Sequence, residues 1–226
     1  MKFGIVIAIY PRPDGKSPFY LQRCIDSVDS QTYKNYKLFV MGDKYGEKLE
    51  GNFEYEDLPY AYERDKYSGG RLWCCGGLNA TNHGIKKAKE NSIDYIIMLD
   101  YDDFWEPNHL QAFVDAGEFD WACTKSKHTL GRFFPEYTGE EKIINFLPKP
   151  SGVVKSSVCY NLKTLPFLPR LVFEEEGYDR ASDWDLWFRQ REYIKTHPEL
   201  NLRSIFINLI TCTKEDEGYA RKAVFV

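Results

Sequence analysis

Three aspartates lie within four positions of the segment MLDYDDFWEP, at residues 98–107. Asp100, Asp102 and Asp103 follow an apolar run, and carboxylates this close together repel one another and resist burial unless a cation neutralises them. The pattern therefore indicates a site for positive charge. The chemistry that such a site supports depends on which cation it holds.

Two familiar uses of clustered aspartates fit this segment poorly. A calcium loop of the EF-hand type beginning at Asp100 would need Gly and Glu where the sequence has Trp105 and Gln111. Capping of a helix started by Pro107 would use one aspartate, in the first instance Asp103, and would leave two unexplained. A hard divalent cation, Mg²⁺ or Mn²⁺, bound by one or two carboxylates and by phosphate oxygens, accounts for the cluster. This interpretation predicts transfer of a group from a nucleotide diphosphate.

Apolar runs predict the elements that position these aspartates. Residues 3–10 and 36–43 are typical of buried parallel strands, and a helix that starts at Ser17 and Pro18 separates them. A third buried strand is expected over 93–99 and leads directly to the aspartates. Ligands bind at the carboxyl ends of strands in open α/β sheets, so this position favours a functional site over a solvated charge patch.

The second half of the sequence predicts a more mixed structure. A helix is expected from Pro107 to Gly117, and residues 125–150, with several Gly and Pro, are expected to form a loop that could cover a substrate. Strands are expected over 119–124, 152–160 and 203–212. The segment YDRASDWDLWFRQREYI, at 178–194, predicts a helix. Four residues fit its buried face: Trp184, Trp187, Phe188 and Ile194.

Composition limits the class of protein. The chain has 226 residues, enough for one sizeable core, and its net charge of −4 argues against a duplex nucleic acid as partner. Six cysteines form no C-x-x-C pair, which favours a reduced, intracellular chain. The N-terminal apolar run has no signal-peptide cleavage site, and no segment approaches the ~18 apolar residues that a membrane span needs. A cytoplasmic protein without a transmembrane segment is expected.

Three segments together resemble family 2-type glycosyltransferases of the GT-A fold. LQRCIDSVDSQTYKNYKLFVMGD, at 21–43, resembles that family's first helix and second strand, and GLNATNHGIKKAKENSIDYIIMLDYDD, at 77–103, resembles the helix and strand that lead to its D-x-D motif. ASDWDLWFR, at 181–189, resembles the segment that carries its catalytic aspartate. The order and spacing of the three segments make the resemblance specific, whereas D-x-D alone is common by chance.

The resemblance implies a role for each of the aspartates. Asp100 and Asp102 occupy the D-x-D positions, so Asp102 is the first-choice ligand for Mn²⁺ or Mg²⁺, and Asp100 would contact both metal and donor. Asp103 is a supporting candidate. Asp183 matches the family's general base, with Asp185 as the alternative and helix capping as the structural interpretation.

Other candidates lie near the same edge. By resemblance, Tyr10 and Asp43, at the ends of the first two strands, would contact the nucleobase of the donor. His83 is a possible donor-edge residue, although a surface role is the more ordinary interpretation. Trp184, beside the expected base, could stack on an acceptor ring or pack in the core.

The sequence departs from the family pattern at several positions. Thr81 stands where the family often has Arg, so Arg71 is the candidate for that donor contact. Gly42 and Ser182 replace acidic residues that usually precede Asp43 and the general base. The family's late histidine is not evident, which leaves a third protein ligand for the metal unassigned.

The resemblance implies a metal-dependent, inverting glycosyltransferase that moves a sugar from a nucleotide-diphosphate sugar, first of all a UDP-sugar, to a hydroxyl acceptor such as a growing glycan. Its fold would be a single GT-A-like α/β domain over 1–226, with a Rossmann-like, mostly parallel sheet flanked by helices. Residues 1–105 would form the donor half and 106–226 a mixed acceptor half. Two alternatives stay open: a non-catalytic nucleotide- or sugar-binding module, and a sugar-phosphate nucleotidyltransferase.

Overall fold

One sheet runs through the whole molecule. The computed structural model describes residues 1–149, 152–172 and 180–215, and within these ranges the sheet has ten strands. Its main path follows the order β3-β2-β1-β4-β9-β6-β10-β5, while β7 pairs with β6 and β8 pairs with β10. The strands are β1 (Phe3–Ile9), β2 (Tyr36–Asp43), β3 (Glu54–Leu58), β4 (Tyr95–Asp100), β5 (Phe104–Trp105), β6 (Trp121–His128), β7 (Phe133–Phe134), β8 (Ile143–Asn145), β9 (Val158–Asn161) and β10 (Ser204–Lys214).

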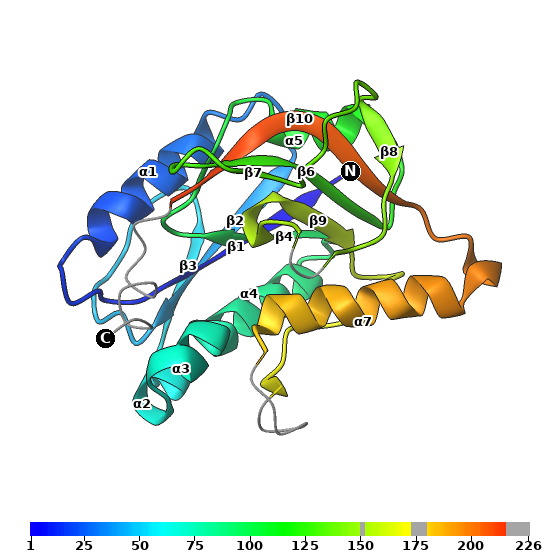
Figure 1. The fold of residues 1–226 in the computed structure, drawn as a ribbon. Coiled ribbons are helices and arrows are strands. Elements are labelled where there is room, and N and C mark those ends of the chain that lie inside the picture. Colours follow the sequence, from blue (N-terminus) through cyan, green and yellow to red (C-terminus); the bar gives the residue numbers. More distant parts are fainter. Residues whose placement is uncertain (150–151, 173–179, 216–226) are drawn as a thin grey trace.

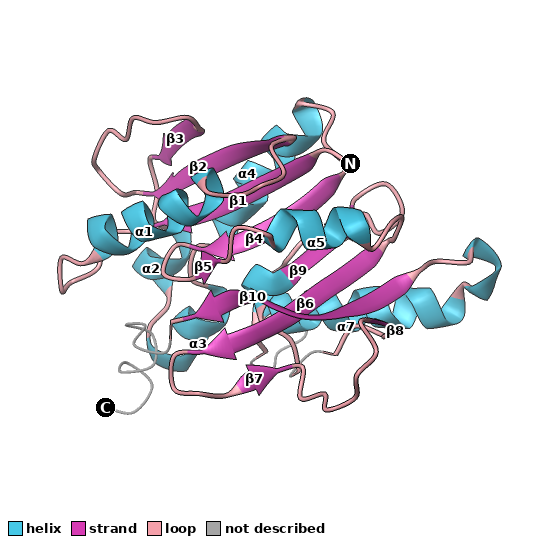
Figure 2. Cartoon of the chain, turned by 90° about the horizontal axis from the view of Figure 1, so that it is seen from above, coloured by secondary structure: helices cyan, strands magenta, loops and turns pink. Residues whose placement is uncertain are grey.

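Helices cover both faces of this sheet (Figure 1). The α-helices are α1 (Ser17–Asp29), α2 (Tyr62–Lys66), α3 (Gly69–Cys75), α4 (Leu78–Glu90), α5 (His109–Asp115) and α7 (Ser182–Thr196), and the 3-10 helices are η1 (Lys155–Ser157) and η2 (Pro198–Leu200). Alternate side chains of β1 point to opposite faces: Ile5 packs in the cluster that contains α1 and α5, and Val6 packs in the cluster that contains α4 and α7. Figure 2 shows α1 and α5 together on the face turned toward the viewer.

Strand directions decide which residues meet at one edge of the sheet. β3, β2, β1 and β4 are parallel, so their carboxyl ends share an edge. β9 is antiparallel to both β4 and β6, and β6 is parallel to β10. Because two reversals restore the direction, β10 runs the same way as β4. Its last residue, Lys214, therefore reaches the edge at which β4 ends with Asp100.

The sequence predicted the first half well and the second half in part. The expected parallel strands and the helix beginning at Ser17 are confirmed, and the second half is mixed as expected. The segment 125–150, expected to be a loop, contains the end of β6 and two short strands, β7 and β8. The segment 152–160 includes η1 before β9.

The expected buried face of the last helix was right for Trp187 and Ile194 and wrong for Trp184 and Phe188. Trp184 and Phe188 are 40% and 42% exposed, whereas Leu186 and Trp187 are buried with Gln190 on the face that packs on the sheet. The prediction assigned all the aromatic residues to one buried face, but their side chains lie on two sides of the helix. Within the described ranges, no helix combines the length and apolar character needed to cross a membrane.

Candidate active site

The aspartate cluster forms a tight turn between β4 and β5. Asp100 ends β4, and the backbone N–H of Asp103 donates to the Asp100 carbonyl at 3.0 Å. Ser156 of η1 holds the turn from the side, because its Oγ accepts from the Asp100 N–H at 3.1 Å and donates to Asp103 Oδ2 at 2.6 Å. Tyr101, inside the turn, packs edge-on against Tyr10 with ring centroids 5.4 Å apart. The turn is thus fixed to η1 and to the end of β1.

Asp103 has a structural role, because both of its carboxylate oxygens accept hydrogen bonds from the protein. Its side chain is fully buried, and its second oxygen accepts from the backbone N–H of Glu215 at 2.9 Å. Burial raises the pKa of Asp103 to about 7, and the negative charges of Asp100 and Asp102 act in the same direction, while Lys214 opposes them. The capping role considered for Asp103 was wrong, since α5 begins after Asn108 without a side-chain cap.

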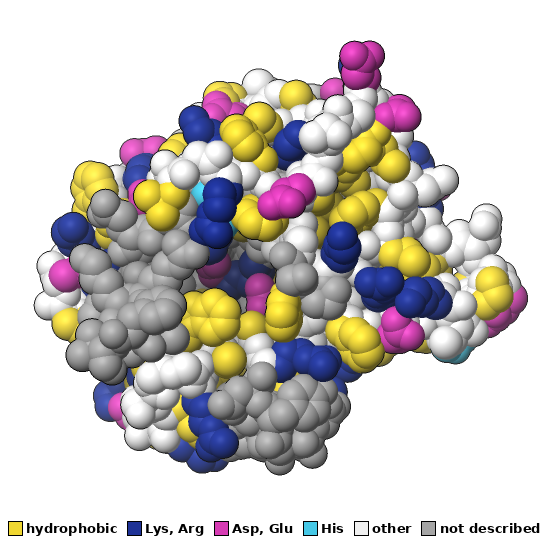
Figure 3. Space-filling model, in the orientation of Figure 1, with side chains coloured by type: hydrophobic (Ala, Val, Ile, Leu, Met, Phe, Trp, Pro, Cys, Tyr) yellow, Lys and Arg dark blue, Asp and Glu magenta, His cyan; other side chains and the backbone are white. Residues whose placement is uncertain are grey.

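Asp100 faces two ammonium groups. Lys155, the first residue of η1, forms an ion pair with Oδ1, and Nζ of Lys214 lies 3.5 Å from Oδ2. Lys214 also lies 3.6 Å from Oδ2 of Asp103, so it bridges two of the three aspartates. The Asp100 side chain is 28% exposed, which leaves it accessible from solvent. Figure 3 shows a hollow in the surface in which acidic and basic side chains lie together.

Asp102 has a looser environment. Its carboxylate lies 3.8 Å from Nη1 of Arg12, beyond hydrogen-bond distance, and its side chain is 17% exposed. Arg12 follows β1, and its guanidinium binds Asp14 through Nε and Nη2 at 3.0 and 2.9 Å. Nη1 of Arg12 is buried and has no hydrogen-bond partner among the described residues. An acceptor oxygen of a ligand within hydrogen-bond distance of Nη1 would satisfy this donor.

The donor set suits a hard divalent cation. Asp100 and Asp102 are solvent-accessible carboxylates, whereas both oxygens of Asp103 are already occupied by hydrogen bonds. In the described part of the chain, no three His, Cys, Asp or Glu side chains are grouped as a ligand set. Two carboxylates are nevertheless what Mg²⁺ or Mn²⁺ needs from the protein when phosphate oxygens and water supply the remaining ligands.

Asp183 lies in the first turn of α7 and belongs electrostatically to the same site. Its Oδ1 accepts from the N–H of Trp184 at 2.8 Å. Burial raises its pKa, an effect opposed by the nearby Lys155 and enhanced by Asp100. Lys155 thus interacts with both Asp100 and Asp183, although these two aspartates are 83 positions apart in the sequence. A raised pKa suits a carboxylate that must accept a proton.

Asp185, two positions later, has the opposite environment. It is 1% exposed and forms ion pairs with Arg170 at 2.8 Å, Arg189 at 2.6 Å and Arg180 at 3.8 Å. Burial alone would raise the pKa of Asp185, but hydrogen bonds from Arg170 and Arg189 outweigh it, so the pKa is lowered. The geometry describes a carboxylate that holds α7 to the segment before it.

The donor-edge candidates separate into two groups. Tyr10 and Asp43 lie at the ends of β1 and β2, and Arg64 of α2 joins them: its guanidinium lies 5.5 Å from the Tyr10 ring centroid, and its Nε donates to Asp43 Oδ2 at 2.8 Å. Oδ1 of Asp43 is buried without a partner among the described residues. By contrast, His83 lies 3.1 Å from Glu56 of the outer strand β3.

The two remaining candidates are exposed. Arg71 lies on the solvent side of α3. Trp184 presents an exposed ring beside Asp183, whereas the neighbouring Trp187 is buried edge-on against Trp121 and Tyr160. The core role expected for Trp187 is therefore confirmed, and Trp184 has a ring surface available to a ligand.

Comparison with known proteins identifies the family to which the chain belongs. No family model matches it. It is 32% identical over 238 residues to an uncharacterized glycosyltransferase, R139, of Acanthamoeba polyphaga mimivirus, with 96% of this chain and 95% of the relative covered. The chain belongs to the glycosyltransferases. This membership confirms the family expected from the three sequence segments.

More distant relatives extend this result. The succinoglycan biosynthesis protein ExoW of Rhizobium meliloti is 26% identical over 186 residues, covering 80% of this glycosyltransferase and 53% of ExoW. Among solved structures, Staphylococcus aureus TarS 1–349 in complex with UDP-GlcNAc matches with a TM-score of 0.66 at 19% identity. That match covers 100% of this chain and 62% of the TarS chain. It confirms the expected GT-A-type fold, and the chain spans about three-fifths of TarS.

Sequence analysis of this glycosyltransferase missed several residues of the site. Arg12 follows β1 directly, which was a usable signal, whereas Arg64 lies in α2, after β3, and reaches Asp43 only in the folded chain. Lys155, Ser156 and Lys214 had no comparable signal, because they reach the site only through the antiparallel strand β9 and the crossover to β10.

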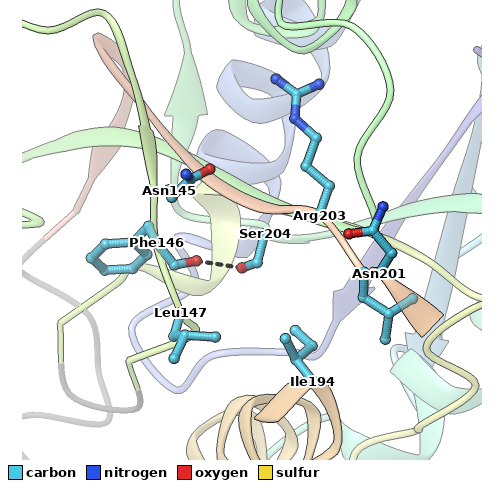
Figure 4. Close-up of a pocket in the computed structure, with 8 residues that line it drawn as sticks. Asn145, Phe146, Leu147, Ile194, Asn201, Arg203 and Ser204 are labelled. Atoms are coloured by element: carbon cyan, nitrogen blue, oxygen red, sulfur yellow. Dashed lines mark hydrogen bonds between the residues drawn. The ribbon is translucent and has the colours of Figure 1, made fainter. Parts of the chain in front are cut away.

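A second hollow of this glycosyltransferase lies away from the aspartates (Figure 4). It is lined by Asn145, Phe146, Leu147, Ile194, Asn201, Leu202, Arg203 and Ser204. Ser204 begins β10 and its hydroxyl donates to the carbonyl of Phe146, so this groove lies at the opposite end of β10 from Lys214. Its lining contains no carboxylate, and it therefore lacks the acid–base chemistry of the aspartate site.

Proposed function

We propose that this glycosyltransferase moves a sugar from a nucleotide-diphosphate sugar to a hydroxyl acceptor with inversion at the anomeric carbon. The observation that carries the proposal is the meeting of two aspartate positions, Asp100 and Asp183, around one cation, Lys155. A UDP-sugar is the first donor to test, since TarS has been crystallised with UDP and with UDP-GlcNAc. A growing glycan is the first acceptor class, because ExoW is named for succinoglycan biosynthesis.

The donor's diphosphate would lie at the turn after β4. Asp102 and Asp100 would hold Mn²⁺ or Mg²⁺, with Asp102 the principal ligand because cationic side chains engage it less closely. When bound, the cation would act as a Lewis acid on the diphosphate leaving group. Nη1 of Arg12 is buried 3.8 Å from Asp102 and would form a hydrogen bond with an oxygen of the nucleotide sugar. Asp103 would keep the turn in place through Ser156 and Glu215.

The nucleobase would lie beyond the ends of β1 and β2. Asp43 has one buried oxygen without a partner among the described residues, which fits an N–H donor on a base, and Arg64 orients that carboxylate through its other oxygen. The ring of Tyr10 lies beside Arg64 and offers an apolar surface. Arg71 would contact the donor from α3.

Asp183 would be the general base. The acceptor hydroxyl gives its proton to the Asp183 carboxylate as its oxygen bonds to the anomeric carbon, and the bond from that carbon to the diphosphate breaks with its electron pair on the phosphate oxygen. Trp184 would support the acceptor through its exposed ring. Asp185 cannot serve equally well, because its oxygens are engaged by arginines.

A thermal-shift panel tests the proposal. Nucleoside diphosphates and their sugars would be added with and without Mn²⁺, and a ligand that binds only the native state raises the melting temperature. We expect one diphosphate and its sugar to stabilise the chain more strongly with Mn²⁺, and the sugar donor to release free nucleoside diphosphate slowly. Release of pyrophosphate would instead indicate nucleotidyl transfer, and binding without any turnover would indicate a non-catalytic module.

A further inference from the structure

Both oxygens of Asp100 already face cations of the protein. Lys155 pairs with Oδ1, and Nζ of Lys214 lies 3.5 Å from Oδ2. These lysines come from η1 and from the end of β10, so the fold converges on Asp100 from two directions. Their side chains are 24% and 33% exposed, which leaves each free to turn toward a ligand entering from solvent.

We propose that Lys155 and Lys214 are internal counter-ions of Asp100 that couple the binding of a divalent cation to the binding of the donor diphosphate. The inference rests on the proposed function and deepens it. With the site empty, the ammonium groups satisfy Asp100 and compete with a metal ion for its oxygens. When a diphosphate enters, the same ammonium groups have a second anion to bind, and Asp100 becomes available to the metal.

Electrostatics requires this competition. An ammonium group and a divalent cation repel each other at the distances that separate two partners of one carboxylate, and the repulsion is strong where water is partly excluded. A diphosphate that lies between the ammonium group and the divalent cation attracts both of them. The two ligands must then assist each other equally, because the coupling free energy between two binding sites is reciprocal.

A second observation indicates that an oxygen-rich anion belongs here. Arg12 has a side chain only 2% exposed, and its Nη1 has no hydrogen-bond partner among the described residues. This N–H group lies 3.8 Å from Oδ2 of Asp102. A phosphate oxygen beside Asp102 would supply the missing acceptor, whereas a metal ion alone would not.

Manganese binding tests the coupling directly. Free Mn²⁺ would be measured by electron paramagnetic resonance during titration of the wild type, Lys155→Met and Lys214→Met, each with and without UDP. We expect UDP to tighten Mn²⁺ binding to the wild type about tenfold, within the usual range of coupling between sites. Each lysine variant should bind Mn²⁺ alone more tightly than the wild type and show a smaller effect of UDP.

Two controls make the result interpretable. Lys163→Met removes a more exposed lysine–aspartate pair, with Nζ 2.6 Å from Asp94 Oδ2 at the amino end of β4, and should leave Mn²⁺ binding and coupling unchanged. Lys155→Arg keeps the charge and should retain the coupling. This variant serves as the comparison if Lys155→Met folds poorly. Wild-type Mn²⁺ affinity in Lys155→Met and Lys214→Met, with UDP still bound, would overturn the coupling alone. Failure of every nucleoside diphosphate in the thermal-shift panel to bind the wild type, with or without Mn²⁺, would overturn the proposed function together with the coupling.

Discussion

The turn after β4 and the first turn of α7 use carboxylates in opposite ways. At the turn, Lys155 pairs with Asp100, and Lys214 lies near both Asp100 and Asp103. Arg12 approaches Asp102 without a hydrogen bond. On α7, three arginines surround Asp185 alone. In the first region two lysines face three aspartates, and Arg12 is already bound to Asp14. In the second region three arginines face one aspartate.

This difference separates a place that can accept charge from a place that is already neutralised. A carboxylate engaged by several guanidinium groups has little affinity left for a proton or a metal ion, and its contribution is to hold segments together. A crowded group of carboxylates can gain free energy by binding a further cation. Asp183 lies between these regions: it shares α7 with Asp185 but interacts with Lys155 and Asp100.

The largest expected effect concerns Asp183. Asp183→Asn removes the proton acceptor while keeping the oxygen that accepts from the Trp184 N–H. Turnover of the donor should fall about 10²–10⁴-fold, the usual contribution of a general base. Nucleotide binding, measured by calorimetry with Mn²⁺ present, should change little. Wild-type turnover by this variant would show that the proton goes elsewhere.

Asp185→Asn is expected to act on stability. Removing the charge leaves the arginines around a neutral amide, a change that costs about 3–5 kcal/mol for a buried pair. We expect the lower figure, because the side chains of Arg170 and Arg189 are 26% and 21% exposed. Water can therefore solvate the two guanidinium groups when the carboxylate charge is removed. Denaturant unfolding measures the effect. Full stability combined with lost turnover would make Asp185 the base.

Glu63 is a third kind of carboxylate, buried with only a backbone donor on one oxygen. The Asn79 N–H donates to its Oε1 at 2.8 Å, while burial, helped by Asp43, raises the pKa of Glu63 from 4.5 to about 7. Between these two values the folded chain keeps a proton that the unfolded chain releases, so this group makes stability fall as pH rises. At about 1.4 kcal/mol per pKa unit, the loss amounts to at most about 3.5 kcal/mol.

Glu63→Gln should remove that loss. Unfolding by denaturant at pH 5 and pH 8 would be compared between the wild type and the variant. We expect the variant to gain stability over the wild type at pH 8 and to differ little at pH 5. An identical pH dependence in the two chains would contradict the raised pKa of Glu63.

Asp102→Asn should give the smallest of these effects. Loss of one charged ligand should weaken metal-dependent donor binding by at least about tenfold, which is the loss that even an outer partner of a metal ligand can cause. Calorimetry with and without Mn²⁺ separates this loss from the metal-independent part of binding. Asp94→Asn, at the other end of β4, is the matched control. Unchanged Mn²⁺ affinity in Asp102→Asn would remove this residue from the metal site.

Local sequence patterns predicted the parallel half of the sheet, because the signals for its strands lie in consecutive residues. The buried strands over 3–10 and 36–43 and the position of Asp100 at a strand end follow from apolar runs and from the rule for parallel sheets. The division of the domain into donor and acceptor halves at residue 105 stays a prediction. The face of α7 was misjudged because Trp184 and Phe188 are large and apolar but exposed.

The sequence by itself determined the family, the parallel half of the sheet and the place of the aspartates at its carboxyl edge, since short-range periodicity and motif spacing are written in consecutive residues. Only the tertiary structure decided which cationic side chains pair with these aspartates. Lys155 and Lys214 reach Asp100 because β9 reverses the chain and β10 restores its direction, and a pairing made across about 55 and 114 positions leaves no local pattern to detect. The same long-range packing distinguished Asp183 from Asp185, because charge partners, and not neighbours in sequence, set what a carboxylate can do.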